Sequence, residues 1–449
     1  MTFRIGDWVF SPKRLILWHS NMPQDEVLTL VEKIDEISGL QKAKETLFSY
    51  DWRQVLINPF QINRIGICVA KNCNLRCRYC SECSTEGMGE EIPNEHILSY
   101  VSDLMIKKVA NSLITGDNSP VKVIFTGGGE PTYDFEKFSQ LVVSIEELAN
   151  RNNMPLYLDI TTNGAYDLKR IDFICQHFQS IMVSYDGMPS IQNYNRPSPY
   201  YALTSPMVES SIKRILDNGV PLIIRSTIAA SDVGKMKEMA DFLFGKFGIN
   251  YKWSIFPVTP KGRARNFRGN VNDSPDFFSE FFSMKEYAQK KYGDVQISSP
   301  LFFSNENDFY CGSLGFLTRV AWLRATGEIV TCLEMDKDQT VIGTLTGNQV
   351  VYKDICEDPL VKITQEKFHE CENCIAFPFC RGGCPADHRA NRIAGEMNVS
   401  WACQQTIKYC QYFLEKIVSG EQGLGWKLSE IPLEVNYSKP VYRLVKEET

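Results

Sequence analysis

Fifteen cysteines, gathered into two groups, constrain this 449-residue chain more than any other feature. Five lie between residues 68 and 83 and nine between 311 and 410, with Cys175 alone between the groups. No signal peptide is evident, because Arg4 and Asp7 precede any apolar run, and no apolar stretch approaches the ~20 residues that cross a bilayer. A chain in the reducing cytosol does not use its thiols as a disulfide framework. The two groups therefore predict two metal-bearing regions in a cytoplasmic protein with no membrane partner.

Composition and charge exclude several other classes of protein. The chain is 43% hydrophobic and 23% charged, which is typical of a globular protein and not of a disordered or fibrous one. Its net charge of −6 gives no bulk electrostatic attraction to nucleic acid. At roughly 150 residues per domain, the length predicts about three units, or one large barrel with an appendage.

The first group contains the sequence Cys73-Asn-Leu-Arg-Cys77-Arg-Tyr-Cys80. Three thiolates this close in sequence can converge on one face of a tight loop, whereas a closed all-cysteine site needs a fourth ligand. The loop therefore suits a [4Fe–4S] cluster with one iron open to an exogenous ligand. The alternative is a zinc loop that borrows a distant ligand, although zinc favours paired C-x2-C knuckles.

Between the two groups, predicted strands alternate with predicted helices. The strands are 65–70, 121–126, 156–162, 181–184, 221–228 and 252–257, and helical spacing covers 96–111, 135–150, 166–177, 208–218 and 234–246. This alternation predicts an α/β fold with a parallel sheet built from about six βαβ units. Polar motifs follow these strands at the ends where parallel barrels place their active sites, namely Gly127–Pro131, Thr161–Gly164 and Tyr185–Gly187.

The chemistry of these motifs is that of a small-molecule site. Gly127–Gly129 let backbone approach a ligand closely, Glu130 offers an acceptor for an ammonium group, and Arg225 can pair with a carboxylate. Taken singly, a glycine run is usually a turn, and Ser-Tyr-Asp-Gly after a strand is usually a loop signal. Their appearance in order on successive strands favours a binding site.

These motifs resemble those of the radical S-adenosylmethionine (SAM) superfamily, whose signature is C-x3-C-x2-C and whose fold is a partial (β/α)6 TIM-like barrel. The resemblance implies that Cys73, Cys77 and Cys80 bind a [4Fe–4S] cluster and that SAM chelates its fourth iron. It also implies SAM contacts from the residues that match the family's motifs. These are Gly128, Gly129 and Glu130 for the amino group, Ser184 and Asp186 for the ribose, Arg225 for the carboxylate, the Tyr79 backbone for adenine, and Thr162 and Asn163 along the pocket.

The second group includes Cys371, Cys374, Cys380 and Cys384 in the spacing C-x2-C-x5-C-x3-C. One closed zinc site is the alternative, but it leaves Cys311, Cys332 and Cys403 without a role. The pattern resembles the SPASM domain, a C-terminal extension with two auxiliary [4Fe–4S] clusters. The resemblance implies that Cys371, Cys374, Cys380 and Cys403 hold the second auxiliary cluster, and that Cys311, Cys332 and Cys384 hold the first.

The fullest SPASM pattern has one more cysteine, which is missing from residues 312–319 of this chain. The resemblance then leaves one iron of the first auxiliary cluster open, unless Cys356 or Cys410 completes it. The remaining cysteines, Cys68, Cys83 and Cys175, are expected to be structural, as buried thiols usually are.

The expected organisation is an N-terminal extension (1–60), a radical SAM barrel (61–300), a SPASM domain (301–415) and a tail (416–449). The extension has apolar stretches at Phe3–Phe10 and Leu15–Trp18 and a helical pattern across Asp25–Leu47. It is expected to be either a partial peptide-binding element or a barrel cap. The tail is polar and interrupted by proline, and it is expected to wrap the surface.

The resemblance implies an oxidoreductase that uses SAM and three [4Fe–4S] clusters. A 5′-deoxyadenosyl radical would abstract hydrogen and lead to a thioether or carbon–carbon cross-link in a ribosomally made precursor peptide with a leader. A flavodoxin or ferredoxin would supply the electron. The alternatives are formylglycine formation on a sulfatase, dehydrogenation of a small molecule, and an electron carrier without catalysis. A carrier, however, has no use for Glu130, Asp186 and Arg225 around an open cluster.

Overall fold

The computed structural model gives a mixed α/β architecture. It describes residues 2–23, 25, 27–29, 64–82, 90–116, 119–267, 277–302, 320–335, 340–353, 371, 373–380, 383–384, 386, 401–421, 426–431 and 441–446. Cys83, Cys311 and Cys356 lie outside the described residues, as do residues 312–319 and most of the helical pattern across Asp25–Leu47.

An eleven-stranded sheet forms the centre of the larger unit, in the order β10-β9-β8-β7-β6-β5-β4-β11-β12-β13-β14. Eight neighbouring strands of this sheet are parallel: β10 (Gln296–Ser298), β9 (Lys252–Pro257), β8 (Leu222–Ile228), β7 (Ser180–Ser184), β6 (Leu156–Thr162), β5 (Val121–Phe125), β4 (Arg64–Ile67) and β11 (Val320–Leu323). The antiparallel strands β12 (Glu328–Val330), β13 (Val341–Thr346) and β14 (Gln349–Tyr352) complete it. The six predicted strands are confirmed, and the sheet extends beyond them on both sides.

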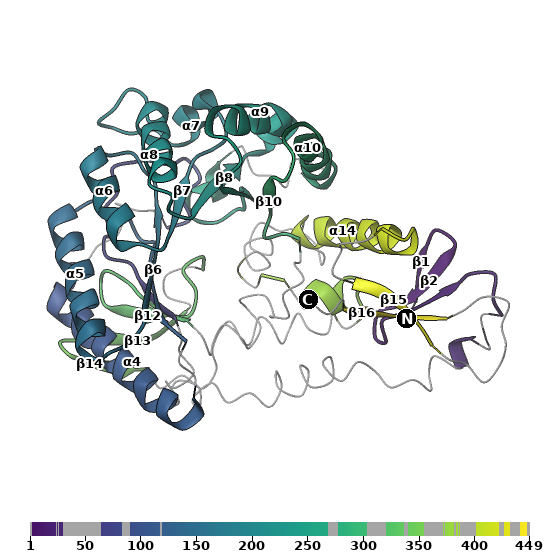
Figure 1. Cartoon of the computed structure of the whole chain (residues 1–449), viewed down its shortest axis with the longest axis horizontal. Coiled ribbons are helices and arrows are strands. Elements are labelled where there is room, and N and C mark those ends of the chain that lie inside the picture. Colours follow the sequence, from purple (N-terminus) through teal and green to yellow (C-terminus); the bar gives the residue numbers. More distant parts are fainter. Residues whose placement is uncertain are drawn as a thin grey trace.

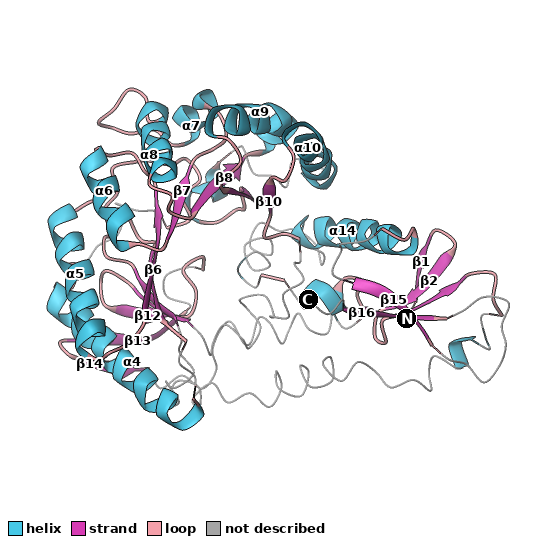
Figure 2. Cartoon of the chain, viewed as in Figure 1, coloured by secondary structure: helices cyan, strands magenta, loops and turns pink. Residues whose placement is uncertain are grey.

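Helices connect the parallel strands and surround the curved sheet (Figures 1 and 2). They are α4 (Asn94–Thr115), α5 (Phe135–Arg151), α6 (Leu168–His177), α7 (Pro189–Asn195), α8 (Ser205–Asp217), α9 (Met236–Phe247) and α10 (Phe277–Tyr292). The Asp134 carboxylate accepts from the Lys137 amide at the start of α5, and Asp167 caps α6 in the same way. The five predicted helices are therefore confirmed, with ends that shift by a few residues.

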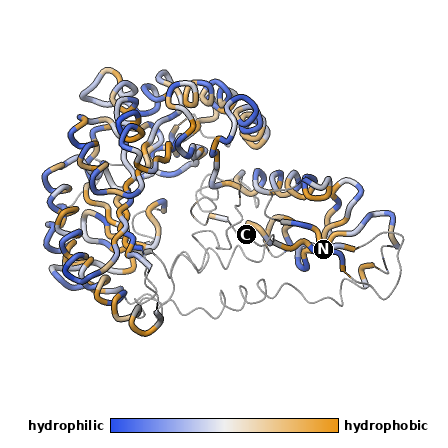
Figure 3. The backbone as a smooth tube through the Cα atoms, viewed as in Figure 1, coloured by the Kyte–Doolittle hydropathy of each residue, from blue (hydrophilic) through white to orange (hydrophobic). Residues whose placement is uncertain are grey.

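The core of this unit lies between the sheet and its helices. Alternate residues of β5 (Val121, Val123 and Phe125) are buried, and the Phe125 ring contacts the rings of Phe138 and Phe178 edge-on. Figure 3 shows apolar segments along the strands and a mixture of apolar and polar segments along the helices. Burial of apolar surface is the main stabilising term for such a layered fold.

A second sheet joins the two ends of the chain. It contains β1 (Phe3–Ile5), β2 (Trp8–Ser11), β3 (Ile16–His19), β16 (Tyr442–Lys446) and β15 (Trp426–Glu430), in that order and all antiparallel. The tail contributes β15 and β16 to this sheet, and β16 pairs with β3 of the N-terminal segment. The apolar stretch Phe3–Phe10 is likewise two strands, separated by a turn at Gly6, which has φ +57°.

The second sheet packs against α14 (Trp401–Val418) and α12 (Phe377–Cys380). Ile5 and Phe10 share an apolar cluster with Ile375, Phe413 and Leu414. The described partners of β1–β3 therefore belong to the C-terminal half of the chain, and the role of residues 1–60 stays a prediction.

Helix α14 also connects the second sheet to the barrel (Figure 1). The Gln405 side chain accepts a hydrogen bond of 3.0 Å from the Phe278 amide at the start of α10, and the Trp401 ring contacts the Phe277 ring edge-on. No helix among the described residues is long and apolar enough to cross a membrane.

Candidate active site

A cavity of about 360 Å³ opens at the carboxyl ends of β7, β8 and β9. Its lining comes from the cysteine loop, the strand ends and the C-terminal extension: Cys77, Tyr79, Cys80, Ser81, Ser184, Arg196, Arg225, Thr227, Phe256, Pro257, Val258, Thr259, Lys261, Pro300, Leu301, Glu334 and Cys384. Six predicted site residues are in this set, namely Cys77, Tyr79, Cys80, Ser184, Arg225 and Cys384. The topology therefore brings together motifs that are up to three hundred residues apart.

The three cysteines of the loop are half-buried neighbours. Burial, and then the Glu130 charge, raises the pKa of the Cys73 thiol to about 11. Burial raises the pKa of Cys77 to about 12, with the charges of Cys80 and Cys73 adding to the shift and that of Arg196 opposing it. The Leu75 amide donates to the Cys73 sulfur at 3.4 Å. Three adjacent thiolates are costly without a compensating cation, so the donor set fits a metal-containing group.

The single-ion zinc alternative receives no support from the residues described. Among them, no three His, Cys, Asp or Glu side chains are placed to hold one metal ion. Thiolates on one zinc ion must all lie about 2.3 Å from the same point. A four-iron cluster spreads its thiolates over several irons and does not require them to meet at one point.

Glu130 lies beneath the cysteine loop and is 3% exposed. Its Oε1 accepts from the Thr132 and Thr162 hydroxyls at 2.9 and 2.7 Å, and its Oε2 accepts from the Asn163 amide at 2.8 Å. Burial raises the pKa of this carboxyl, and the hydrogen bonds oppose the shift. Thr162 and Asn163, predicted along the pocket, instead hold Glu130, and neither is among the described residues that line the cavity.

Gly128 and Gly129 lie against the backbone of the cysteine loop, and their SAM contact stays a prediction. The Gly129 amide donates to the Ala70 carbonyl at 2.6 Å, and a Cβ on Gly129 would lie 1.8 Å from the Asn72 carbonyl oxygen. A Cβ on Gly128 would lie 2.6 Å from the Ala70 carbonyl oxygen. These glycines allow β5 and the cysteine loop to pack closely.

Asp186 contacts several protein groups in the structure, and its ribose contact stays a prediction. Its carboxylate is 0% exposed, accepts from the Thr227 amide at 3.0 Å and from the Tyr79 hydroxyl, and lies 3.1 Å from Arg196 Nε in an ion pair. Protein groups therefore surround both carboxylate oxygens. Asp186 holds Tyr79, which lies between Cys77 and Cys80 in sequence, and so positions the cysteine loop.

Arg196, Lys261 and Glu334 line the cavity but were missed in the sequence. Lys261 Nζ lies 3.2 Å from a Glu334 carboxylate oxygen, and the positive charges of Lys261 and then Arg225 lower the pKa of Glu334. Arg225 stacks on Phe256, with its Cζ 4.0 Å from the ring centroid. Each of these three residues stands outside any periodic pattern or known motif. The sequence therefore carried no signal that they line the site.

The C-terminal cysteines fall into two described sets. Cys332 and Cys384 pack together, and burial and then the Cys384 charge raise the pKa of Cys332 to about 12. Cys410 lies near Cys374 and Cys380, whose charges, after burial, raise its pKa. Cys410 is therefore placed beside the predicted second auxiliary set. Cys371 and Cys403 are half-buried, and Cys311 lies outside the described residues.

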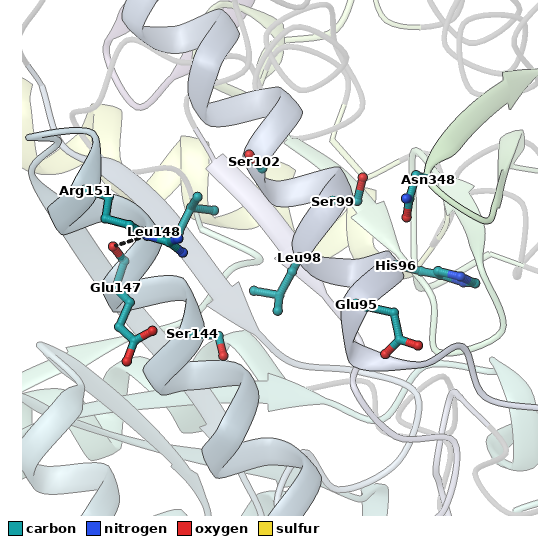
Figure 4. A pocket seen from close by; sticks show the side chains of 10 residues that line it. All are labelled: Glu95, His96, Leu98, Ser99, Ser102, Ser144, Glu147, Leu148, Arg151 and Asn348. Carbon is teal, nitrogen blue, oxygen red and sulfur yellow. Dashed lines mark hydrogen bonds between the residues drawn. The ribbon is translucent and has the colours of Figure 1, made fainter.

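A second hollow, of about 440 Å³, lies on the outer surface between α4 and α5 (Figure 4). Its side chains include Glu95, His96 and Ser144, and the Arg151 side chain donates to the Glu147 carbonyl at 3.3 Å. No cysteine and no predicted site residue is among its described lining residues. The chemistry is therefore assigned to the first cavity.

Residues 67–243 match the model of the radical SAM superfamily, and they run from the end of β4 into α9. This segment is a radical SAM domain. It contains the cysteine loop, Glu130, Asp186 and Arg225, and the family match together with the curated relatives indicates a SAM-dependent enzyme.

Two curated relatives match most of this radical SAM chain. A cysteine-type anaerobic sulfatase-maturating enzyme of Clostridium perfringens is 22% identical over 371 residues, which are 78% of this chain and 95% of that enzyme. An enzyme of the same description from Clostridium novyi is 20% identical over 377 residues, which are 80% and 96% of the two chains.

Two solved structures share the fold, including a C-terminal extension. Native anSMEcpe with bound AdoMet is 18% identical, with a TM-score of 0.57 over 79% of this chain and 97% of that chain. Streptococcus suis SuiB bound to its precursor peptide SuiA is 16% identical, with a TM-score of 0.53 over 76% of each chain. About a fifth of the present radical SAM chain thus lies outside the match with anSMEcpe.

Proposed function

We propose that this radical SAM maturase acts on a residue of a peptide and installs a cross-link, either a thioether or a carbon–carbon bond. The observation that carries the proposal is the composition of the cavity. Cys77 and Cys80 form one part of its wall, Ser184 and Arg225 another, and Cys384 of the C-terminal extension a third. A cluster, a nucleotide cofactor and an auxiliary group would therefore meet at one space.

The residues of the cavity fit SAM and a [4Fe–4S] cluster. Cys73, Cys77 and Cys80 would hold the cluster, and Arg225 would bind the carboxylate of SAM. Bound together, the cluster and SAM supply reductive radical chemistry that removes hydrogen from carbon. The chain would orient both groups through Glu130 below the loop and through Asp186 behind Tyr79.

The C-terminal extension supports a peptide substrate and auxiliary clusters. Cys384 lines the cavity and Cys332 packs beside it, so an auxiliary cluster held there would adjoin the substrate. Both relatives of known structure have been solved with a bound peptide. We propose two auxiliary [4Fe–4S] clusters, with Cys371, Cys374, Cys380 and Cys403 at the second.

A second candidate function is formylglycine formation on a sulfatase, because curated relatives that match four fifths of the chain are sulfatase-maturating enzymes. The two candidates give different products. A cross-link removes two hydrogens from the peptide and creates no aldehyde. Formylglycine is an aldehyde, and it reacts with hydrazide probes. Co-expression with candidate precursor and sulfatase peptides, followed by mass spectrometry and hydrazide labelling, separates them.

Reductive SAM cleavage tests the enzyme assignment itself. Reconstituted, dithionite-reduced protein should release 5′-deoxyadenosine, and Cys77→Ala should abolish this release. Cys175→Ala, on the outer helix α6, is the matched control and should retain activity. Release that survives in Cys77→Ala, or none from the reduced native protein, would overturn the proposal.

A further inference from the structure

Exposed tyrosines lie near Arg76 and Arg78 of the cysteine loop. Tyr133, Tyr194, Tyr200 and Tyr201 are each between 40% and 60% exposed. Arg78 is exposed beside them and Arg76 is half-buried. We call these six residues the Arg–Tyr patch.

Backbone and ring contacts hold the Arg–Tyr patch together as one surface. The Arg76 and Arg78 amides donate to the carbonyls of Pro197 and Asn195 at 2.7 and 2.9 Å, which ties the cysteine loop to the segment after α7. The Arg78 guanidinium lies 4.2 Å from the centroid of the Tyr194 ring.

The tyrosines at the other end of the patch are linked in the same way. The Tyr200 amide donates to the Ser198 hydroxyl at 3.0 Å, and that hydroxyl donates to the Asn74 carbonyl at 2.9 Å. The Tyr200 and Tyr201 rings lie 6.4 Å apart. The segment before α8 is therefore tied to the cysteine loop as well.

The two arginines give the patch a positive charge on a chain whose net charge is −6. Neither Arg76 nor Arg78 forms an ion pair with a carboxylate anywhere in the part of the chain that the structure describes. The Arg76 guanidinium donates to the Cys73 and Leu75 carbonyls at 2.6 and 2.9 Å and is held in place by them. Exposed arginine and tyrosine are the residues most enriched at protein interfaces.

The position of the patch relates it to the cluster ligands. Arg76 and Arg78 flank Cys77, and consecutive Cα atoms are only about 3.8 Å apart. Cys77 lines the cavity, whereas Arg78 and the four tyrosines are exposed and are not among the described residues that line it. A partner on the patch would therefore approach the cluster without entering the space for substrate.

We propose that the Arg–Tyr patch is the docking site for an acidic one-electron carrier protein of the flavodoxin or ferredoxin type. The proposal rests on the proposed function, which consumes an electron in each reductive cleavage of SAM. Electron transfer falls steeply with distance, so the donor must reach the surface that covers the cluster. Opposite charge guides such an encounter and fixes its orientation.

The test compares a protein donor with a chemical one. In Arg78→Glu and Tyr201→Glu, SAM cleavage driven by reduced flavodoxin should fall about tenfold or more at low salt, in line with the gain that electrostatic steering gives. Cleavage driven by dithionite should stay at the native rate, because dithionite needs no docking surface. Lys213→Glu, an exposed charge reversal on α8, is the matched control and should change neither rate.

A direct measurement of flavodoxin binding tests the docking site independently of SAM cleavage. Titration of oxidised flavodoxin should show weaker affinity for both patch variants and unchanged affinity for Lys213→Glu, even in protein that cleaves no SAM. Tyr201 lies outside the cysteine loop, so its variant remains informative if Arg78→Glu loses its cluster.

Unchanged flavodoxin affinity in Tyr201→Glu would overturn the proposal. Patch variants that lose binding of the precursor peptide but keep binding of flavodoxin would overturn it as well. Loss of the dithionite-driven rate in the native protein would instead overturn the proposed function alone.

Discussion

Arg196 and Asp186 form an ion pair whose side chains are only 8% and 0% exposed. The Arg196 Cζ also lies 5.3 Å from the centroid of the Tyr79 ring, so this pair and Tyr79 form one buried unit. Removing one member of a buried pair leaves the other charge unsolvated, which costs far more than removing an exposed pair. This unit connects fold stability with the placement of the cysteine loop.

Asp186→Asn should therefore lower the free energy of unfolding by roughly 3–5 kcal/mol, measured by urea denaturation under anaerobic conditions. It should also reduce the iron bound after reconstitution, because Tyr79 loses its partner. Asp172→Asn is the matched control: Asp172 pairs with Arg214 at 2.6 Å, but both are exposed, so the cost should stay below about 1 kcal/mol. An equal loss in the free energy of unfolding for the two variants would contradict the interpretation that Asp186, Arg196 and Tyr79 form a buried unit.

Gly129 gives a second test at the residue scale. An added Cβ would meet the Asn72 carbonyl at 1.8 Å, and a backbone atom cannot rotate away as a side chain can. Gly129→Ala should therefore destabilise the protein by roughly 1–3 kcal/mol and displace the cysteine loop, as urea denaturation and iron content would show.

The control for this glycine is Gly245→Ala on helix α9, where an added Cβ meets nothing within 4 Å. Alanine is the better helix former there, so the substitution should stabilise the protein by about 0.5–1 kcal/mol. If the two substitutions changed the free energy of unfolding equally, close packing of Gly129 on the cysteine loop could not explain the destabilisation by Gly129→Ala.

At the scale of elements, the sequence predicted what local patterns encode. The strands from 121–126 to 252–257 each have period-two or apolar patterns, and their helices have a clear apolar face, so the radical SAM barrel could be predicted. β10 and β11 are three and four residues long and carry too little pattern. The pairing of β3 with β16 joins residues that are more than four hundred positions apart, and no local signal specifies such a partner.

The same distinction applies to the site. Cys77, Cys80, Ser184 and Arg225 belong to motifs and were found in the sequence, and the structure places all four on the cavity. Asp186 also belongs to a motif, but its partner Arg196 does not, so its role became visible only through the contacts. A motif thus predicts where a residue lies better than it predicts what that residue binds.

The sheet that joins the two ends of the chain should depend on Leu444. This β16 side chain is buried, and its amide donates to the Leu15 carbonyl at 2.7 Å. Leu444→Ala should cost about 2–5 kcal/mol and should speed amide exchange in β2 and β3, while exchange in β6 and β8 stays slow. Val351→Ala, exposed on β14, should change stability by less than about 0.5 kcal/mol. Uniformly faster exchange across both sheets would contradict a separate second sheet.

For the whole molecule, the arrangement of the cysteines predicts a countable amount of iron. The cysteine loop and the Cys332–Cys384 set adjoin one cavity, whereas Cys374 and Cys380 lie in the apolar cluster under the second sheet. Three separate [4Fe–4S] sites correspond to roughly twelve irons per chain, without stoichiometric zinc. Because the three proposed clusters share no cysteine, substitution of a ligand should remove one cluster and leave the other two.

Cys77→Ala and Cys384→Ala should each lose roughly four irons and retain the other eight, because each removes a ligand from a different cluster. Anaerobic reconstitution followed by elemental analysis measures the iron, and Mössbauer spectra show whether the remaining iron is still in [4Fe–4S] form. Cys175→Ala should keep the full complement, since this thiol lies alone on α6. Loss of all iron from Cys384→Ala would mean that the C-terminal extension and the cysteine loop fold as one dependent unit. One zinc per chain in place of four irons would restore the zinc interpretation for the second cysteine group.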